Sequence, residues 1–156
     1  MSGTDLLQQA CERLPGSWHL QCWDIRYDDG RAPSYPFGPD AAGLIVYTHD
    51  GSMSACIARA ARAPLSSESV RSAPVAEQLA AFESYFQYAG AYHLREQDGG
   101  VVVVHEVQFA LNPNFVGSQQ VRRVQLDADG GLTLSASDRL PGQSVLRHHR
   151  LQWRRA

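Results

Sequence analysis

Hydrophobic and polar residues alternate along most of the chain with a period of two, which is typical of β-strands that bury one face. Turn residues such as Gly, Pro, Asn and Asp separate the alternating runs. The pattern predicts strands at residues 17–27, 43–49, 52–59, 90–97, 100–110, 118–127, 131–136 and 144–154. Most connections are short and no strand–helix–strand rhythm is present, so we expect an antiparallel sheet.

Two other segments follow the three- and four-residue spacing of an α-helix. The first covers residues 4–14 and ends at Pro15-Gly16. The second begins at Pro74 and extends to about Gln87. We therefore expect a short N-terminal helix and one helix inserted after the third strand.

Eight sequentially paired antiparallel strands remove both free edges when they close into a barrel. An eight-stranded barrel has an interior just wide enough for one small ligand. At 156 residues the chain is long enough to bury a core without disulfides or metal. The sequence therefore predicts one all-β domain over residues 1–156, a closed eight-stranded up-and-down barrel.

Two local patterns refine the predicted register. The alternation changes parity near Cys22 and Trp23, which predicts a bulge in the first strand. The dipeptide Asp50-Gly51 predicts a two-residue hairpin turn, in which Tyr47 faces Ser54 and Thr48 faces Met53. The period alone does not decide which of these two pairs points inward.

Composition limits the possible partners. Sixteen acidic and fourteen basic residues leave a net charge of −2, which argues against nucleic-acid and membrane-surface binding. All basic residues are Arg, so lysine Schiff-base chemistry is excluded. Three cysteines without CxxC spacing, a polar N-terminus and the lack of a long apolar run predict a cytoplasmic protein, monomeric or homodimeric.

His105 is the first candidate for chemistry. It belongs to a run in which one face is otherwise apolar, made of Val101, Val103, Val107 and Phe109. An imidazole buried in an apolar cavity stays neutral, which suits a general base or a hydrogen-bond donor to a ligand carbonyl. The alternative is a core histidine satisfied by a neighbouring hydroxyl or backbone group.

Arg122 is the second candidate for chemistry. It shares a face with Gln120, Val124 and Leu126, so it points inward if Leu126 does. No inward acid stands out as its partner, and a buried guanidinium is costly without one. An anionic or polarised ligand oxygen would satisfy it. Alternatively, Arg122 joins a network of tyrosine hydroxyls or stacks on an aromatic ring.

Several other residues are candidates for contact with a ligand, although each also fits ordinary packing or turn formation. Three tyrosines surround the expected helix-to-strand corner, two residues flank the Asp-Gly turn, three form apolar walls and two lie on a connection at the barrel mouth. They are Tyr85, Tyr88 and Tyr92; Tyr47 and Met53; Val103, Val107 and Phe109; and Asn114 and Phe115. The adjacent His148 and His149 point to opposite faces of a strand, and no metal-ligand spacing is present, so we expect no metal or cofactor.

Motifs in order from Gly16 to Arg155 resemble the bacterial and fungal lipocalin-like domain proteins. The chain opens its first strand with Gly16-x-Trp18 and closes its last with Leu151-x-Trp153-x-Arg155. The most specific stretch is Asn112-Pro113-Asn114-Phe115-Val116-Gly117, which runs into Gln120-x-Arg122. This resemblance implies a calycin-type barrel in which Arg155 packs over Trp18, with Arg154 as the alternative.

The resemblance also implies a function. Members of this group are similar to small-molecule binders, and some relatives are cofactor-free enzymes of natural-product cyclisation or isomerisation. We therefore expect a small, largely apolar ligand with carbonyl, hydroxyl or acidic groups. In an isomerase, cyclase or lyase, His105 would act as acid or base and Arg122 would stabilise a developing enolate. In a carrier or sensor, the same residues would only anchor the ligand.

Overall fold

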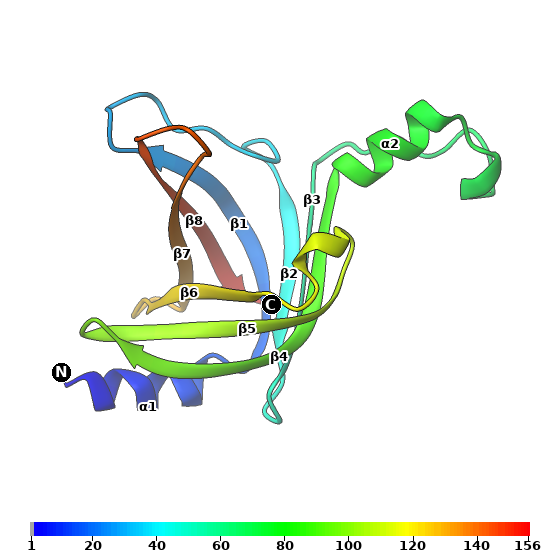
Figure 1. Cartoon of the computed structure of the whole chain (residues 1–156). Coiled ribbons are helices and arrows are strands. Elements are labelled where there is room, and N and C mark those ends of the chain that lie inside the picture. Colours follow the sequence, from blue (N-terminus) through cyan, green and yellow to red (C-terminus); the bar gives the residue numbers. More distant parts are fainter. Residues whose placement is uncertain (1) are drawn as a thin grey trace.

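Each strand pairs with the next along the chain, and the last strand pairs back with the first, so that the sheet closes into a barrel (Figure 1). The computed structural model describes residues 2–156. All pairings are antiparallel, which confirms the eight-stranded barrel predicted from the sequence. The strands are β1 (Gly16–Tyr27), β2 (Ala42–Tyr47), β3 (Ser52–Ala58), β4 (Tyr85–Gln97), β5 (Gly100–Ala110), β6 (Gln119–Leu126), β7 (Gly131–Arg139) and β8 (Leu146–Arg155). The helices are α1 (Gly3–Arg13) and α2 (Val75–Glu83), with the short 3₁₀ turns η1 (Val70–Ser72) and η2 (Pro113–Phe115).

Helix α1 packs against β4 and β5 at one end of the barrel. Ser2 and Asp5 form a reciprocal capping box at its start, which satisfies two backbone donors of the first turn. Val102 and Val104, on the outer face of β5, are buried, as expected where a helix packs on the sheet. The predicted N-terminal helix is confirmed.

The last strand contacts the segment that joins α1 to the first strand. The guanidinium of Arg155 lies 3.9 Å from the centre of the Trp18 ring, and its Nη1 donates to the Pro15 carbonyl at 2.8 Å. The Trp18 indole donates to the carbonyl of the fully buried Leu14 at 2.9 Å. Arg155, rather than Arg154, therefore covers the first-strand tryptophan, as the resemblance implied.

Residues 59–84 form a projecting arm between β3 and β4. Figure 1 shows that the arm, with η1 and α2, extends away from the barrel. Helix α2 ends at Glu83, not near Gln87 as predicted, because residues 85–87 pair with β3 instead. Strand pairing therefore prevails over the local helical spacing, and Tyr85 and Tyr88 lie on opposite faces of a strand rather than one helical turn apart.

The hairpin between β2 and β3 differs from the prediction by one residue. Tyr47 pairs with Met53, and the backbone N–H of Thr48 donates to the Ser52 carbonyl, which leaves His49, Asp50 and Gly51 as the loop. Of these three, Gly51 alone has a positive φ, so the loop is not the two-residue turn predicted. Tyr47 and Met53 consequently share the inner face, where both are buried.

Two bulges set which residues face inward. The predicted bulge in β1 is present, as a register shift between Leu20 and Cys22. A second, unpredicted shift in β5 lies opposite Ala89 and Gly90 and reverses the alternation after Val107. The prediction that Phe109 lies on the inner face is therefore wrong, and its side chain is 69% exposed.

The helices are too short and too polar for a membrane span: within residues 2–156, none has the length and apolar character that a crossing requires.

Candidate functional site

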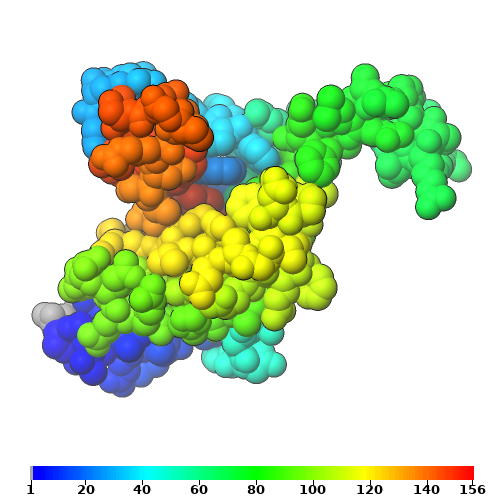
Figure 2. All heavy atoms as spheres, in the orientation of Figure 1, coloured from blue at the N-terminus to red at the C-terminus, as the bar shows by residue number. Residues whose placement is uncertain are grey.

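A pocket of about 570 Å³ lies inside the barrel, and no residue of α1 lines it. Figure 2 shows the hollow between the β7–β8 turn, in orange, and the β5–β6 segment, in yellow. Most of its lining is apolar and comes from Trp23, Ile45, Ala55, Ile57, Phe86, Phe115, Val121, Leu134, Ala136, Leu151 and Trp153. The polar lining comes from Tyr88, His105, Gln119, Gln120, Arg122, Ser137, Asp138, Arg147 and His149.

The pocket reaches the wall between β6 and β7. Pairing of these strands runs from Leu126 with Leu132 to Arg123 with Ser135. Residues 119–122 of β6 and 136–138 of β7 lie beyond the last pair, and both segments line the pocket. Strands β6 and β7 are thus paired at one end of the barrel and separate at the other, and we call this separation the β6–β7 seam.

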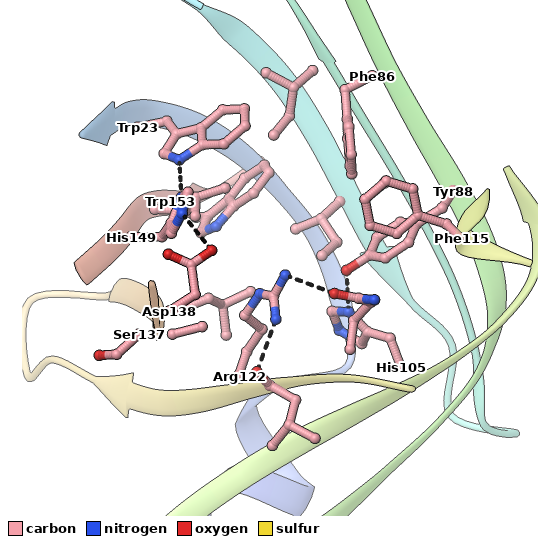
Figure 3. Close-up of a pocket in the computed structure, with 18 of the residues that line it drawn as sticks. Trp23, Phe86, Tyr88, His105, Phe115, Arg122, Ser137, Asp138, His149 and Trp153 are labelled. Carbon is pink, nitrogen blue, oxygen red and sulfur yellow. Dashed lines mark hydrogen bonds and ion pairs between the residues drawn. The ribbon is translucent and has the colours of Figure 1, made fainter. Parts of the chain in front are cut away.

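His105 lies between two tyrosine hydroxyls at the inner end of the pocket. Its Nε2 is 2.7 Å from the Tyr47 hydroxyl and its Nδ1 is 2.6 Å from the Tyr88 hydroxyl. These contacts join β2, β5 and β4. Both imidazole nitrogens are therefore used, and of the two tyrosines it is Tyr88, not Tyr47, that lines the pocket (Figure 3).

Hydrogen-bond satisfaction fixes the direction of this chain. Within residues 2–156 the Tyr47 hydroxyl hydrogen-bonds to His105 alone, and the residue is fully buried. A buried hydroxyl that does not donate loses a hydrogen bond, and Tyr47, unlike Tyr88, does not line the pocket where another acceptor could be met, so Tyr47 donates to Nε2. The ring hydrogen of the neutral imidazole is then on Nδ1 and is donated to Tyr88. The Tyr88 O–H is consequently free to donate into the pocket.

Burial keeps all three groups of this chain neutral. It lowers the pKa of His105 to about 3, and the positive charge of Arg122 acts in the same direction. Burial also raises the pKa of the Tyr47 and Tyr88 hydroxyls. At neutral pH the inner end of the pocket therefore carries one charge, that of Arg122.

Arg122 points into the barrel, as its parity predicted. It pairs with the inward Val103, and its guanidinium donates to the Val121 carbonyl at 2.9 Å and to Gln120 Oε1 at 3.2 Å. Both acceptors are neutral, and no carboxylate of residues 2–156 lies within 4.0 Å of it. The pocket thus holds a cation whose charge the described protein does not balance.

A second polar group, which we call the rim cluster, consists of Trp23, Asp138, Arg147 and His149. Arg147 donates two hydrogen bonds to the Asp138 carboxylate, from Nε at 2.5 Å and from Nη2 at 3.0 Å, and these lower the pKa of Asp138. His149 Nε2 is 3.5 Å from Asp138 Oδ2, and the Trp23 indole donates to His149 Nδ1 at 3.4 Å. Burial lowers the pKa of His149, although Asp138 opposes this shift.

Four of the predicted site residues line the pocket: Tyr88, His105, Phe115 and Arg122. Tyr47, Met53, Val103 and Val107 lie deeper, in the core beneath it. The ring of Tyr92 packs against Tyr47 and its hydroxyl donates to the Thr48 carbonyl, away from the pocket. Tyr85 stacks under Arg62 at the base of the projecting arm, Asn114 is exposed on η2, and Phe109 is on the outer face.

Sequence reasoning missed the β7 and β8 side of the pocket. The alternating residues Arg147, His149, Leu151 and Trp153 all face inward, and this parity was visible in the sequence. Asp138 had no such signal, because the predicted strand ended at residue 136 while β7 continues to Arg139. Within residues 2–156, no three His, Cys, Asp or Glu side chains are grouped so as to hold a metal ion.

The family follows from the sequence as a whole. Residues 15–156 match the family model of the lipocalin-like domain. The chain belongs to this family. No curated protein shows a significant match to the sequence. A lipocalin-like barrel with an internal, mostly apolar pocket indicates binding of a small hydrophobic molecule.

Proposed function

We propose that this lipocalin-like barrel binds a small, largely apolar molecule that carries a carboxylate or carbonyl oxygen. The observation that carries the proposal is the guanidinium of Arg122, which no carboxylate pairs, inside a mostly apolar pocket. An anionic oxygen would supply the missing charge, and a charge-assisted hydrogen bond is strong where water is excluded.

The neighbouring Tyr88 supports the same ligand chemistry. Its hydroxyl ends the chain that starts at Tyr47 and presents an O–H donor to the pocket. Arg122 and Tyr88 therefore both offer hydrogen-bond donors to the ligand. The volume of about 570 Å³ is in the range of pockets that hold a small organic molecule.

Straight-chain acids and the alcohols of equal length test this proposal. Dodecanoate and dodecanol, titrated by calorimetry, differ in the anionic group that Arg122 would bind. We expect dodecanoate to bind the wild type more tightly than dodecanol, and Arg122→Gln to weaken dodecanoate binding by about tenfold to a hundredfold. Arg123→Gln is the matched control, because Arg123 is the next residue on β6 and points outward. Equal dodecanoate affinity in Arg122→Gln and wild type would refute the proposal.

The hydrogen-bonded series Tyr47–His105–Tyr88 favours a second candidate function, the cofactor-independent isomerisation, cyclisation or lyase-type cleavage of a carbonyl compound. Tyr88 would donate a hydrogen bond to a developing enolate oxygen, with His105 and Tyr47 holding its hydroxyl in place, while a water molecule takes the α-proton and a proton from water later returns to carbon. Arg122 would stabilise the enolate charge. The resemblance to a family that includes some cofactor-free cyclases and isomerases supports this candidate; the alternative is a carrier or sensor that uses the same contacts without conversion.

Enolisation is measurable without knowledge of the natural substrate. We would follow deuterium exchange at the α-carbons of 2-tetralone, an apolar ketone, by NMR in D₂O. If the protein is a catalyst, we expect the wild type to accelerate this exchange and the variants Tyr88→Phe and Arg122→Gln to lose most of the acceleration. Binding of 2-tetralone without faster exchange supports the carrier, and acceleration that survives both substitutions would rule out these residues as its source.

A further inference from the structure

The rim cluster contains a donor and an acceptor whose positions are fixed. An indole N–H can only donate, so the hydrogen bond from Trp23 requires an unprotonated Nδ1 on His149. The ring hydrogen of the neutral His149 is then on Nε2, which faces Asp138 (Figure 3). Arg147 binds both oxygens of Asp138 and holds the carboxylate in this position.

These two groups face each other without forming a good hydrogen bond. The distance of 3.5 Å between His149 Nε2 and Asp138 Oδ2 exceeds the usual N–H···O range of about 2.7–3.2 Å. The neighbouring His148 does not compete, because it lies on the outer face and contacts Ser137 and Asp28. The rim cluster therefore presents an N–H donor and a carboxylate acceptor side by side at the wall of the pocket.

A hydroxyl group is the ligand chemistry that matches this pair. It accepts one hydrogen bond from His149 and donates another to Asp138, whereas a carboxylate would be repelled by Asp138 and an ammonium could not accept from His149. Arg147, beside the same carboxylate, also disfavours a cationic group.

We propose that the rim cluster is a second subsite, which binds a hydroxyl group of the ligand through His149 and Asp138. The inference rests on the proposed function, since the first subsite is the Arg122–Tyr88 pair. The two subsites lie on different walls, with Tyr88 and Arg122 on β4 and β6 and the rim cluster mainly on β7 and β8. The ligand class is thus a hydroxy acid or hydroxy carbonyl compound with an apolar body.

The test uses straight-chain acids from octanoate to tetradecanoate, each with and without a terminal hydroxyl, titrated by calorimetry against the full-length protein. A hydroxyl placed in an apolar pocket without partners weakens binding, by about tenfold. We expect this loss to be absent in the wild type at the chain length that reaches the rim cluster. In His149→Phe and in Asp138→Asn the hydroxy acid of that length binds about tenfold more weakly than in the wild type, while its parent acid binds as before.

His148→Phe is the matched control, because it removes the adjacent histidine from the outer face and is expected to change neither affinity. Asp138 is half-exposed at the end of β7, so Asp138→Asn keeps the test informative if His149→Phe fails to fold. If the terminal hydroxyl weakens binding to the wild type at every chain length while Arg122→Gln still weakens binding of the parent acids, the subsite alone is overturned. If the parent acids bind Arg122→Gln as tightly as the wild type, the proposed function is overturned and the subsite with it.

Discussion

His105 links the stability of the barrel to the chemistry of the pocket, because both of its nitrogens are bound by tyrosines on other strands. Its neighbours require a neutral imidazole: one nitrogen accepts from Tyr47 and the other donates to Tyr88. Protonation would break the first of these bonds and place a second positive charge beside Arg122. The residue is therefore an acceptor and donor of fixed direction rather than an exposed base.

A pH dependence of stability follows from this arrangement. The pKa of His105 is about 3 in the folded protein, against 6.5 for an ordinary histidine. Between these values the unfolded chain binds more protons at this site, so the free energy of unfolding rises with pH from about 3 to 6.5 and the contribution is constant above. The slope from one such group is at most about 1.4 kcal/mol per pH unit.

Urea denaturation between about pH 4 and pH 7 measures this slope. His105→Gln is the comparison, since an amide can donate and accept but does not titrate. The carboxylates with lowered pKa, such as Asp129 and Asp138, contribute with the same sign to both proteins and cancel in the difference. Parallel stability curves for wild type and His105→Gln would contradict the shifted histidine.

At the scale of strands, Gly90 sets the register that places the pocket residues. A Cβ on Gly90 would lie 1.9 Å from the Glu106 carbonyl oxygen, so β4 approaches β5 more closely than any other residue allows. We expect Gly90→Ala to destabilise the protein by about 3 kcal/mol or more, because backbone must move at the bulge. Gly99→Ala, which meets no atom within 4 Å but has a positive φ, should cost only about 1 kcal/mol. Similar urea midpoints for the two variants would show that the close approach is not required.

The closure of the barrel gives a second prediction at this scale. Arg155 stacks on Trp18 and donates to the carbonyls of Pro15 and Arg13, which joins β8 to the segment between α1 and β1. Lysine cannot reproduce a planar, multi-donor contact, so Arg155→Lys should lower the free energy of unfolding by about 2 kcal/mol. Arg154→Lys changes an exposed ion pair with Asp129 and should cost less than about 0.5 kcal/mol. The ranking is checked by thermal and urea unfolding, and equal losses would refute it.

The elements themselves were largely predictable, because alternation, turn residues and strand number all favour the same barrel. What sequence could not supply were the features set by contacts between strands. The bulge opposite Gly90 places Phe109 on the outer face. Pairing with β3 ends α2 early, so that Tyr85 lies on the face of β4 that points away from the pocket. Both depend on the approach of a neighbouring strand, which a single-strand period does not encode.

At the scale of the whole molecule, the site combines residues from most of the strands. Parity was sufficient to place His105 and Arg122 inside the barrel, because each lies on a regular, uninterrupted alternation. The partners of His105 were not predictable, since Tyr47 lies in a hairpin whose predicted register was off by one residue and Tyr88 lies outside the predicted strand, which began at residue 90. The rim cluster required the extension of β7 to Arg139, a consequence of its pairing with β8.

The separation of β6 from β7 predicts how the whole barrel responds to a ligand. Residues 119–122 and 136–139 lack a partner across this seam, whereas β4 and β5 are paired along nearly their full length. Their backbone amides should therefore exchange with solvent faster than those of β4 and β5. Because the pocket is lined by these same segments, saturating dodecanoate should slow exchange there and leave the β4–β5 turn unchanged.

Hydrogen exchange measured by mass spectrometry distinguishes this seam from a second apolar concavity on the projecting arm. A second groove, of about 560 Å³, runs along the exposed apolar side of α2 and is lined by Val75, Leu79 and Phe82. Protection confined to α2 would place the acid in that groove and contradict binding inside the barrel. If the acid binds to Arg122 inside the barrel, dodecanoate slows exchange at residues 119–122 and 136–139 of the wild type. The same protection is then absent in Arg122→Gln, and the projecting arm is unaffected in both proteins.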